Sequence, residues 1–116
     1  MRIERDSDGK PIVELTEFKG DIYVCTRNET QFLSMLRLLE VSGFRWSSGH
    51  APTELFKSYK NQHGGNIDLY TWGEFTFGYD LCRGGSSHVE YQKYLEKEGI
   101  SEELLAEVNA WFDARS

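Results

Sequence analysis

The sequence has no apolar run near the roughly 18 residues of a membrane-spanning helix, and its charged start, MRIERDSDGK, lacks the apolar block of a signal peptide. It has only two cysteines, Cys25 and Cys82, and no CxxC or HxxxH spacing. We therefore expect a cytoplasmic protein without membrane association, bound metal or cofactor. Because both cysteines lie in strand-like segments, we expect reduced, half-buried thiols rather than a disulfide.

An excess of basic residues is also lacking: the formal net charge is -6, which argues against general nucleic-acid binding, because Lys and Arg supply most of that affinity. The charge is uneven. Residues 84–116 carry three basic and seven acidic side chains, whereas residues 27–60 carry five basic and three acidic ones. The basic middle and the acidic tail could meet within one molecule or between two, or could be two solvated faces.

What is present indicates a folded domain. Hydrophobic residues make up 39% of the chain and aromatic residues 14%, enough apolar content to offset the entropy of ordering. With 116 residues, the chain is predicted to form a single domain over 1–116, in which residues 1–83 form a sheet with one helix and residues 84–116 form C-terminal helices.

Residues 21–49 are predicted to form the part of the fold around which the rest of the chain is arranged. DIYVCT alternates as a central strand, with Ile22 and Val24 on one side and Tyr23 on the other. Thr26 and Glu29 have the spacing of a capping box, which predicts a helix from residue 27 to the glycine at 43. GFRW then predicts a strand. The two strands flanking this helix are expected either as a parallel pair or as neighbours in a mainly antiparallel sheet, and a later hairpin favours the second.

Other elements follow from turn and cap signals. PIVELTEF (11–18) has strand composition, and Lys19-Gly20 suits a hairpin to the next strand. Pro52 suits the start of a short helix. Two alternating runs around Gly73-Glu74 predict a hairpin with a type II′ turn, and Gly78 suggests a bulge or a close backbone approach. Ser87 and Glu90 predict the cap of one C-terminal helix, and Ser101 the cap of the next. The fold class is α+β: about five mainly antiparallel strands, one helix on the sheet and a C-terminal helical hairpin.

No catalytic pattern emerges. Cys25 or Cys82 with His50, His63 or His88 could form a nucleophile and base, but no local signature accompanies them, and a structural role is the favoured interpretation. A small enzyme using Cys82 or a histidine stays as an alternative. No pair of carboxylates stands out for acid–base work.

Two surfaces are candidate binding sites. The glycine pair, the arginine and the following helix start in RGGSS could cradle a phosphate, although a plain loop with a serine cap explains the same residues. Aromatic residues on the hairpin could stack a base, or could be core pairs. The candidate ligand-binding residues are Arg83, Gly84, Gly85, Ser86, Ser87 and Tyr79, and the candidate partner-binding residues are Arg45, His50 and Trp111.

One segment carries a resemblance. TRNETQFLSMLRLLEVSGFRWSSG (Thr26 to Gly49), flanked by an apolar strand, resembles small proteins often encoded by bacteriophages and prophages, in which a helix ends in a G-x-x-W-x-S-G turn. The likeness covers about a fifth of the chain. It implies a phage-type accessory protein, of a class whose small acidic members often inhibit a host defence protein or sequester a nucleotide immune signal.

We therefore expect a non-catalytic binding protein whose partner is a host protein or a small nucleotide, and which forms a homo-oligomer through its C-terminal helices. A third interpretation, motivated by the acidic tail, is a nucleic-acid-mimicking inhibitor.

Overall fold

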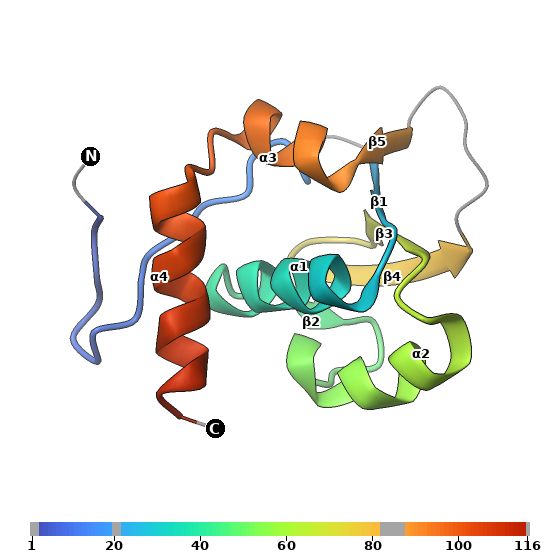
Figure 1. Cartoon of the computed structure of the whole chain (residues 1–116), viewed down its shortest axis with the longest axis horizontal. Helices are drawn as coiled ribbons and strands as arrows, with labels where there is room; N and C mark the ends of the chain where they lie inside the picture. Colours follow the sequence, from blue (N-terminus) through green and yellow to red (C-terminus); the bar gives the residue numbers. More distant parts are fainter. Residues whose placement is uncertain (1–2, 20–21, 82–87, 116) are drawn as a thin grey trace.

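The computed structural model describes residues 3–19, 22–81 and 88–115, which form a five-stranded sheet with helices (Figure 1). The strands are β1 (Tyr23–Thr26), β2 (Arg45–Trp46), β3 (Ile67–Thr71), β4 (Thr76–Leu81) and β5 (His88–Glu90). The helices are α1 (Glu29–Val41), the short 3-10 turn η1 (Pro52–Leu55), α2 (Phe56–His63), α3 (Tyr91–Glu98) and α4 (Glu102–Asp113). The predicted α+β class is confirmed, and none of these helices has the length and apolar character needed to cross a membrane.

The strand order is β2-β4-β3-β1-β5. The pairs β1/β3 and β3/β4 are antiparallel, whereas β2 runs parallel to β4 and β5 runs parallel to β1. The two strands that flank α1 therefore run parallel to each other but are separated by β3 and β4, and the favoured expectation that they would be neighbours is wrong. The hairpin β3–β4 occupies the place between them.

Helix α1 starts later than its capping box predicted. Its N-cap is Asn28, whose side-chain oxygen accepts from the Gln31 amide at 2.9 Å. Thr26 is instead the last residue of β1, and its buried hydroxyl donates to the carbonyl of Gly65 at 2.8 Å. The Thr26 hydroxyl therefore bonds to the backbone of the loop before β3 and does not cap α1. The predicted end is confirmed, because the helix stops at Val41 and Gly43 has a φ of 87°.

The segment 11–18 is not a strand, contrary to the prediction. Its one ladder contact is an isolated bridge between Arg5 and Pro11, although Val13, Leu15 and Phe18 are buried in the core. The amides near its end bond to a carboxylate on α3 instead of to β1. The apolar composition of the segment therefore predicted its burial in part, since Ile12 is 48% exposed, and it did not predict the backbone partner.

The β3–β4 hairpin is confirmed, but its turn is not the two-residue type II′ turn. The Trp72 amide donates to the Thr76 carbonyl at 2.8 Å, which leaves three residues in the loop. The last of these, Phe75, has a φ of 57°, a left-handed conformation that few aromatic residues adopt. Gly78 lies in regular β4 rather than in a bulge, and its close neighbour is the Tyr70 side chain rather than a backbone.

The C-terminal helical pair is confirmed. Gly99 ends α3 with a φ of 78°, and the Ser101 hydroxyl caps α4 by accepting from the Leu104 amide at 3.1 Å. The predicted role of Glu90 in a capping box is wrong, because Glu90 ends β5 and its carboxylate binds Arg27. Its predicted capping partner, Ser87, lies outside the described residues.

Parts of the basic middle and the acidic tail meet within the molecule. Arg27 binds Glu90 through two hydrogen bonds of 2.9 and 2.7 Å. Arg37 on α1 reaches Asp113 on α4 at 3.1 Å and also donates to Asn109. Because the carboxylates of both pairs are exposed, we expect each ion pair to add little to stability.

Burial of a phenol on α3 predicts a loss of stability at high pH. Burial raises the pKa of Tyr91 to about 12, and its hydrogen bond of 2.6 Å with Ser34 lowers that pKa by a smaller amount. A pKa that is higher in the folded state means that the stabilisation is complete below pH 10 and is lost as the pH rises toward 12, by about 2–3 kcal/mol. Urea denaturation at several pH values should show Tyr91→Phe with a shallower fall in unfolding free energy above pH 10. An unchanged slope would contradict the assignment.

Candidate binding face

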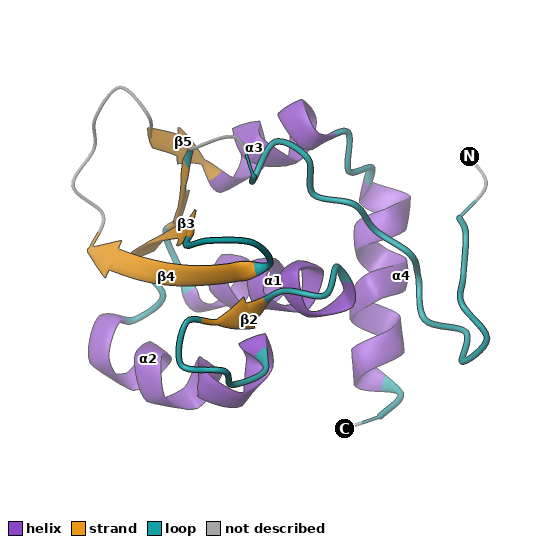
Figure 2. Cartoon of the chain, turned by 180° about the vertical axis from the view of Figure 1, so that it is seen from behind, coloured by secondary structure: helices purple, strands orange, loops and turns teal. Residues whose placement is uncertain are grey.

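On one face of the sheet, β3 and β4 are covered by none of the described helices. Helices α1 and α2 lie against the other face, as the view from behind shows (Figure 2). Along β3, Ile67 and Leu69 are fully buried and belong to the core under these helices. The alternation of a strand then places Asp68, Tyr70 and Trp72 on the helix-free side, which we call the open face.

Strand register sorts the open face into three rows. The middle row crosses four strands and consists of Gly78, Tyr70, Tyr23 and His88. At the hairpin end, Arg45 pairs with Thr76, which lies opposite Trp72. The row at the other end consists of Asp80, Asp68, Cys25 and Glu90. One end of the open face is thus aromatic and basic, and the other is rich in carboxylates.

The aromatic rings of the open face contact one another. The ring centroids of Tyr23 and Tyr70 lie 4.9 Å apart with planes tilted by 32°, and Trp72 lies 6.5 Å from Tyr70 at 65°. Gly78 makes room for Tyr70, because an added Cβ would lie 3.3 Å from the phenol oxygen. Trp72 keeps 62% of its surface exposed, an unusual fraction for a residue of this size.

The carboxylate row is organised by two pairs. His88 Nε2 lies 2.9 Å from Asp68 Oδ1, and both side chains are nearly buried, although the two atoms are not aligned as a hydrogen bond. At the neighbouring position, the hydrogen bonds from Arg27 lower the pKa of Glu90, and the same bonds raise the pKa of Arg27. Both acids are therefore held in place by a basic neighbour.

Cys25 departs from the sequence prediction. It is fully buried and disulfide-bonded, so the expectation of a reduced, half-buried thiol is wrong for this residue. The other cysteine, Cys82, lies outside the described residues. Sequence reasoning missed the bond because a disulfide requires two Cα atoms about 4.4–6.8 Å apart, and the strand order that decides such distances was not predicted.

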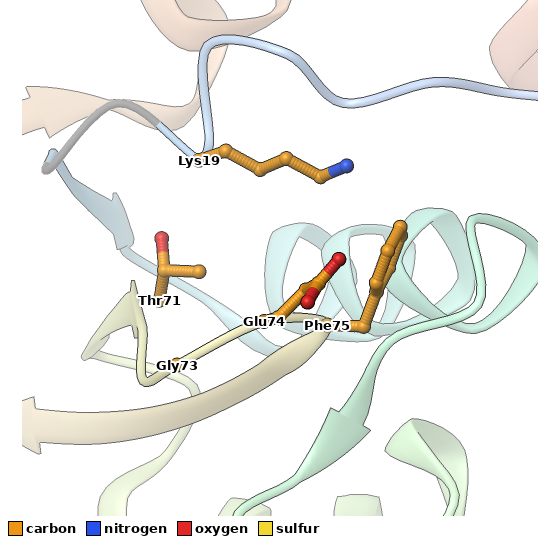
Figure 3. Close-up of a pocket in the computed structure, with 5 residues that line it drawn as sticks. All are labelled: Lys19, Thr71, Gly73, Glu74 and Phe75. Atoms are coloured by element: carbon orange, nitrogen blue, oxygen red, sulfur yellow. The ribbon is translucent and has the colours of Figure 1, made fainter.

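A cavity of about 440 Å³ lies at the tip of the β3–β4 hairpin. Figure 3 shows the side chains of Lys19, Glu74 and Phe75 around it. The Lys19 ammonium lies 4.0 Å from the centre of the Phe75 ring. Phe75 also packs on Phe44 at 5.3 Å between centroids. These contacts compensate for the left-handed backbone of Phe75 and give the cavity one cation, one anion and one aromatic wall.

Of the predicted site residues within the described ranges, only Arg45 lies at the open face. Arg45 is exposed at its edge, whereas Tyr79 points the other way and packs on Tyr59 of α2 at 4.6 Å. His50 lies in the loop after β2 and contacts Ser48 at 2.8 Å, and Trp111 lies on α4 under the guanidinium of Arg115, 3.8 Å from the ring. The predicted phosphate loop, Arg83, Gly84, Gly85, Ser86 and Ser87, lies outside the described residues.

Sequence reasoning missed Tyr23 and the pair of His88 with Asp68 as members of one surface. The signal for Tyr23 was present, because alternation set it opposite Ile22 and Val24. His88 joins the face only because β5 pairs with β1, and a strand of three residues leaves almost no periodic signal.

Comparisons of the chain with protein-family models, with curated proteins and with solved structures give no match. The fold and the chemistry of the open face therefore carry the functional argument.

Proposed function

We propose that this chain is a non-catalytic binding protein that recognises a protein partner through the aromatic end of the open face. The observation that carries the proposal is Trp72, 62% exposed on a helix-free sheet face beside Tyr70, Tyr23 and Arg45. Trp, Tyr and Arg are the residue types that most often dominate the binding energy of an interface.

Exposed apolar surface on the same hairpin supports this. Phe75 is 39% exposed at the turn, at the same end of the hairpin as Trp72. A protein that keeps two large apolar side chains in water at one end of a hairpin gains free energy when a partner covers them. The hairpin is held by two antiparallel ladders, so little conformational entropy is lost when it binds.

The resemblance to phage-encoded accessory proteins supports binding as the activity itself. In this proposal the partner is a host defence factor met in the host cytoplasm, which the protein inhibits by occupying its surface. Association of two copies through α4, on which Trp111 is half-buried, stays a prediction from the sequence.

A small nucleotide is the second candidate ligand. The indole of Trp72 offers a stacking surface for a base, and Arg45, in the same row, offers a cation for a phosphate. Both interpretations assign Trp72 the largest contribution, so one substitution tests both.

We predict that Trp72→Ala abolishes partner binding. The wild-type protein and two variants, Trp72→Ala and Trp111→Ala, are immobilised, and the proteins that each retains from host lysate are compared by quantitative mass spectrometry. A hot-spot tryptophan contributes about 2–4 kcal/mol, which corresponds to a loss of about 30-fold or more in affinity. Native mass spectrometry with a mixed nucleotide pool forms the parallel arm for the second candidate.

Trp111 is also partly exposed but lies on α4, so Trp111→Ala tests the alternative that the partner binds the C-terminal helices. A protein retained by the wild type and by Trp111→Ala but lost from Trp72→Ala supports the proposal. A ligand set that is the same for all three proteins refutes the assignment to the open face.

A further inference from the structure

We infer that the reduced protein binds one zinc ion at the carboxylate end of the open face, through Cys25 Sγ, a ring nitrogen of His88 and a carboxylate oxygen of Glu90. The three donor atoms all lie within 4.8 Å of one another. This site is separate from the aromatic end that serves the proposed function.

Strand pairing holds the three residues together. Cys25 and Glu90 are opposite each other in the parallel pair β1/β5, and His88 precedes Glu90 by two positions, so it lies on the same face. Neither strand needs to move for the donors to meet. Zinc bonds of about 2.0–2.3 Å require the donors to approach by roughly 1 Å, which side-chain rotation can supply.

The donor set suits zinc. Sulfur, imidazole nitrogen and carboxylate oxygen are its usual protein ligands, and three such ligands with water in the fourth position form a common open site. A thiolate and a carboxylate also neutralise the two positive charges of the ion, which matters because Cys25 is fully buried and the His88 side chain is only 10% exposed.

Two neighbours contact the ligands. Asp68 Oδ1 lies 2.9 Å from His88 Nε2, and a rotation of the imidazole would align these two atoms as the carboxylate–histidine pair that orients a metal-binding histidine. Arg27 fixes the Glu90 carboxylate through two hydrogen bonds. Asp68 is thus a positioning residue for His88.

Reduction opens the site. Cys25 is disulfide-bonded, and a bonded sulfur is a poor zinc ligand. A dithiol reductant, of the kind that keeps cytoplasmic thiols reduced, transfers two electrons and two protons to the disulfide, giving two thiols and the oxidised, cyclic dithiol. Zinc then displaces the proton of the Cys25 thiol, which passes to solvent, and a sulfur–zinc bond forms.

The test measures zinc content in two redox states. Protein is incubated with zinc sulfate either after oxidation or in the presence of a phosphine reductant, then desalted, and bound metal is measured by elemental mass spectrometry. We expect about one zinc per chain in the reduced state and almost none in the oxidised state. Circular dichroism follows the fold in both states.

Variants separate a built site from adventitious binding. His88→Ala should retain less than a tenth of the bound zinc under reducing conditions, whereas His50→Ala, which changes a histidine in an exposed loop, should bind like the wild type. With cobalt as the probe, the reduced wild type should show a sulfur-to-cobalt absorption band. Asp68→Asn should keep that band while zinc affinity falls about 10- to 100-fold, because the sulfur ligand is intact and only the histidine is less well oriented.

The inference is overturned if the reduced wild type retains no zinc, if His88→Ala and His50→Ala retain equal amounts, or if reduction unfolds the chain and zinc does not restore it. Each of these outcomes leaves the Trp72 experiment unaffected, so the two proposals fail independently.

Discussion

Gly65→Ala should destabilise the protein by about 3–5 kcal/mol, the largest effect that we expect from any single methyl group in the described chain. An added Cβ would lie 2.4 Å from the carbonyl carbon of Asn28 and 2.6 Å from the Glu29 nitrogen. Both atoms are backbone at the start of α1, so no side chain can move aside. The φ of 82° at Gly65 adds the cost of a left-handed alanine.

The neighbouring glycine is the matched control. Gly64 has a φ of 63°, and an added Cβ there would meet nothing within 4 Å, so Gly64→Ala should cost only about 1–2 kcal/mol. Urea denaturation of both variants gives the comparison. Equal losses would show that the loop before β3 does not pack on the start of α1 in the way that the Thr26 hydrogen bond indicates.

These two glycines also show which structural features can be predicted from the sequence. Two adjacent glycines between a helix and a strand predict a turn, and the turn is present between α2 and β3. The sequence does not say which glycine touches another element, because that contact joins positions 28 and 65. Caps, turns and alternation therefore predict where most helices and strands lie. Contacts between residues far apart in sequence determine how these elements pack against one another.

The candidate site also combines features that local signals predict with features that depend on contacts between distant residues. Alternation in β1 and β3 was sufficient to put Tyr23, Tyr70 and Trp72 on the side away from Val24 and Leu69. It could not align Tyr70 with Tyr23, because register depends on which strands are neighbours. It also could not bring His88 to Cys25, since β5 returns to the edge of the sheet beside β1 after a connection that no local pattern specifies.

The wrongly predicted first strand has a specific physical cause. The amides of Glu17 and Phe18, and the hydroxyl of Thr16, all donate to the carboxylate of Glu98 on α3, at 3.0, 3.2 and 3.1 Å. A carboxylate satisfies several donors at once, so the segment needs no partner strand there. Pro11, Val13 and Leu15 are buried at alternate positions, as they would be in a strand, which is why composition alone was misleading.

Glu98→Ala should therefore lower the unfolding free energy by about 3–4 kcal/mol. Besides the three N-terminal donors, the carboxylate accepts the Tyr94 hydroxyl at 2.5 Å. Tyr94 is fully buried, so the substitution leaves a phenol hydroxyl without its acceptor in the core. Hydrogen exchange should also show faster exchange at the amides of Glu17 and Phe18, a local readout that a general loss of stability would not confine to this segment.

Two further substitutions test whether the loss comes from the hydrogen bonds that Glu98 accepts. Glu96→Ala removes an exposed carboxylate from the same helix, one that lies 3.9 Å from Lys93, and should change stability by less than about 0.5 kcal/mol.

In a double-mutant cycle, Tyr94→Phe should cost about 1–2 kcal/mol in the wild type but almost nothing in Glu98→Ala, where the hydroxyl has already lost its acceptor. Additive losses in the cycle would mean that Glu98 stabilises the chain through the N-terminal segment alone. A loss for Glu96→Ala as large as that for Glu98→Ala would instead assign the effect to the charge of α3, because the two carboxylates differ in their partners and not in their chemistry.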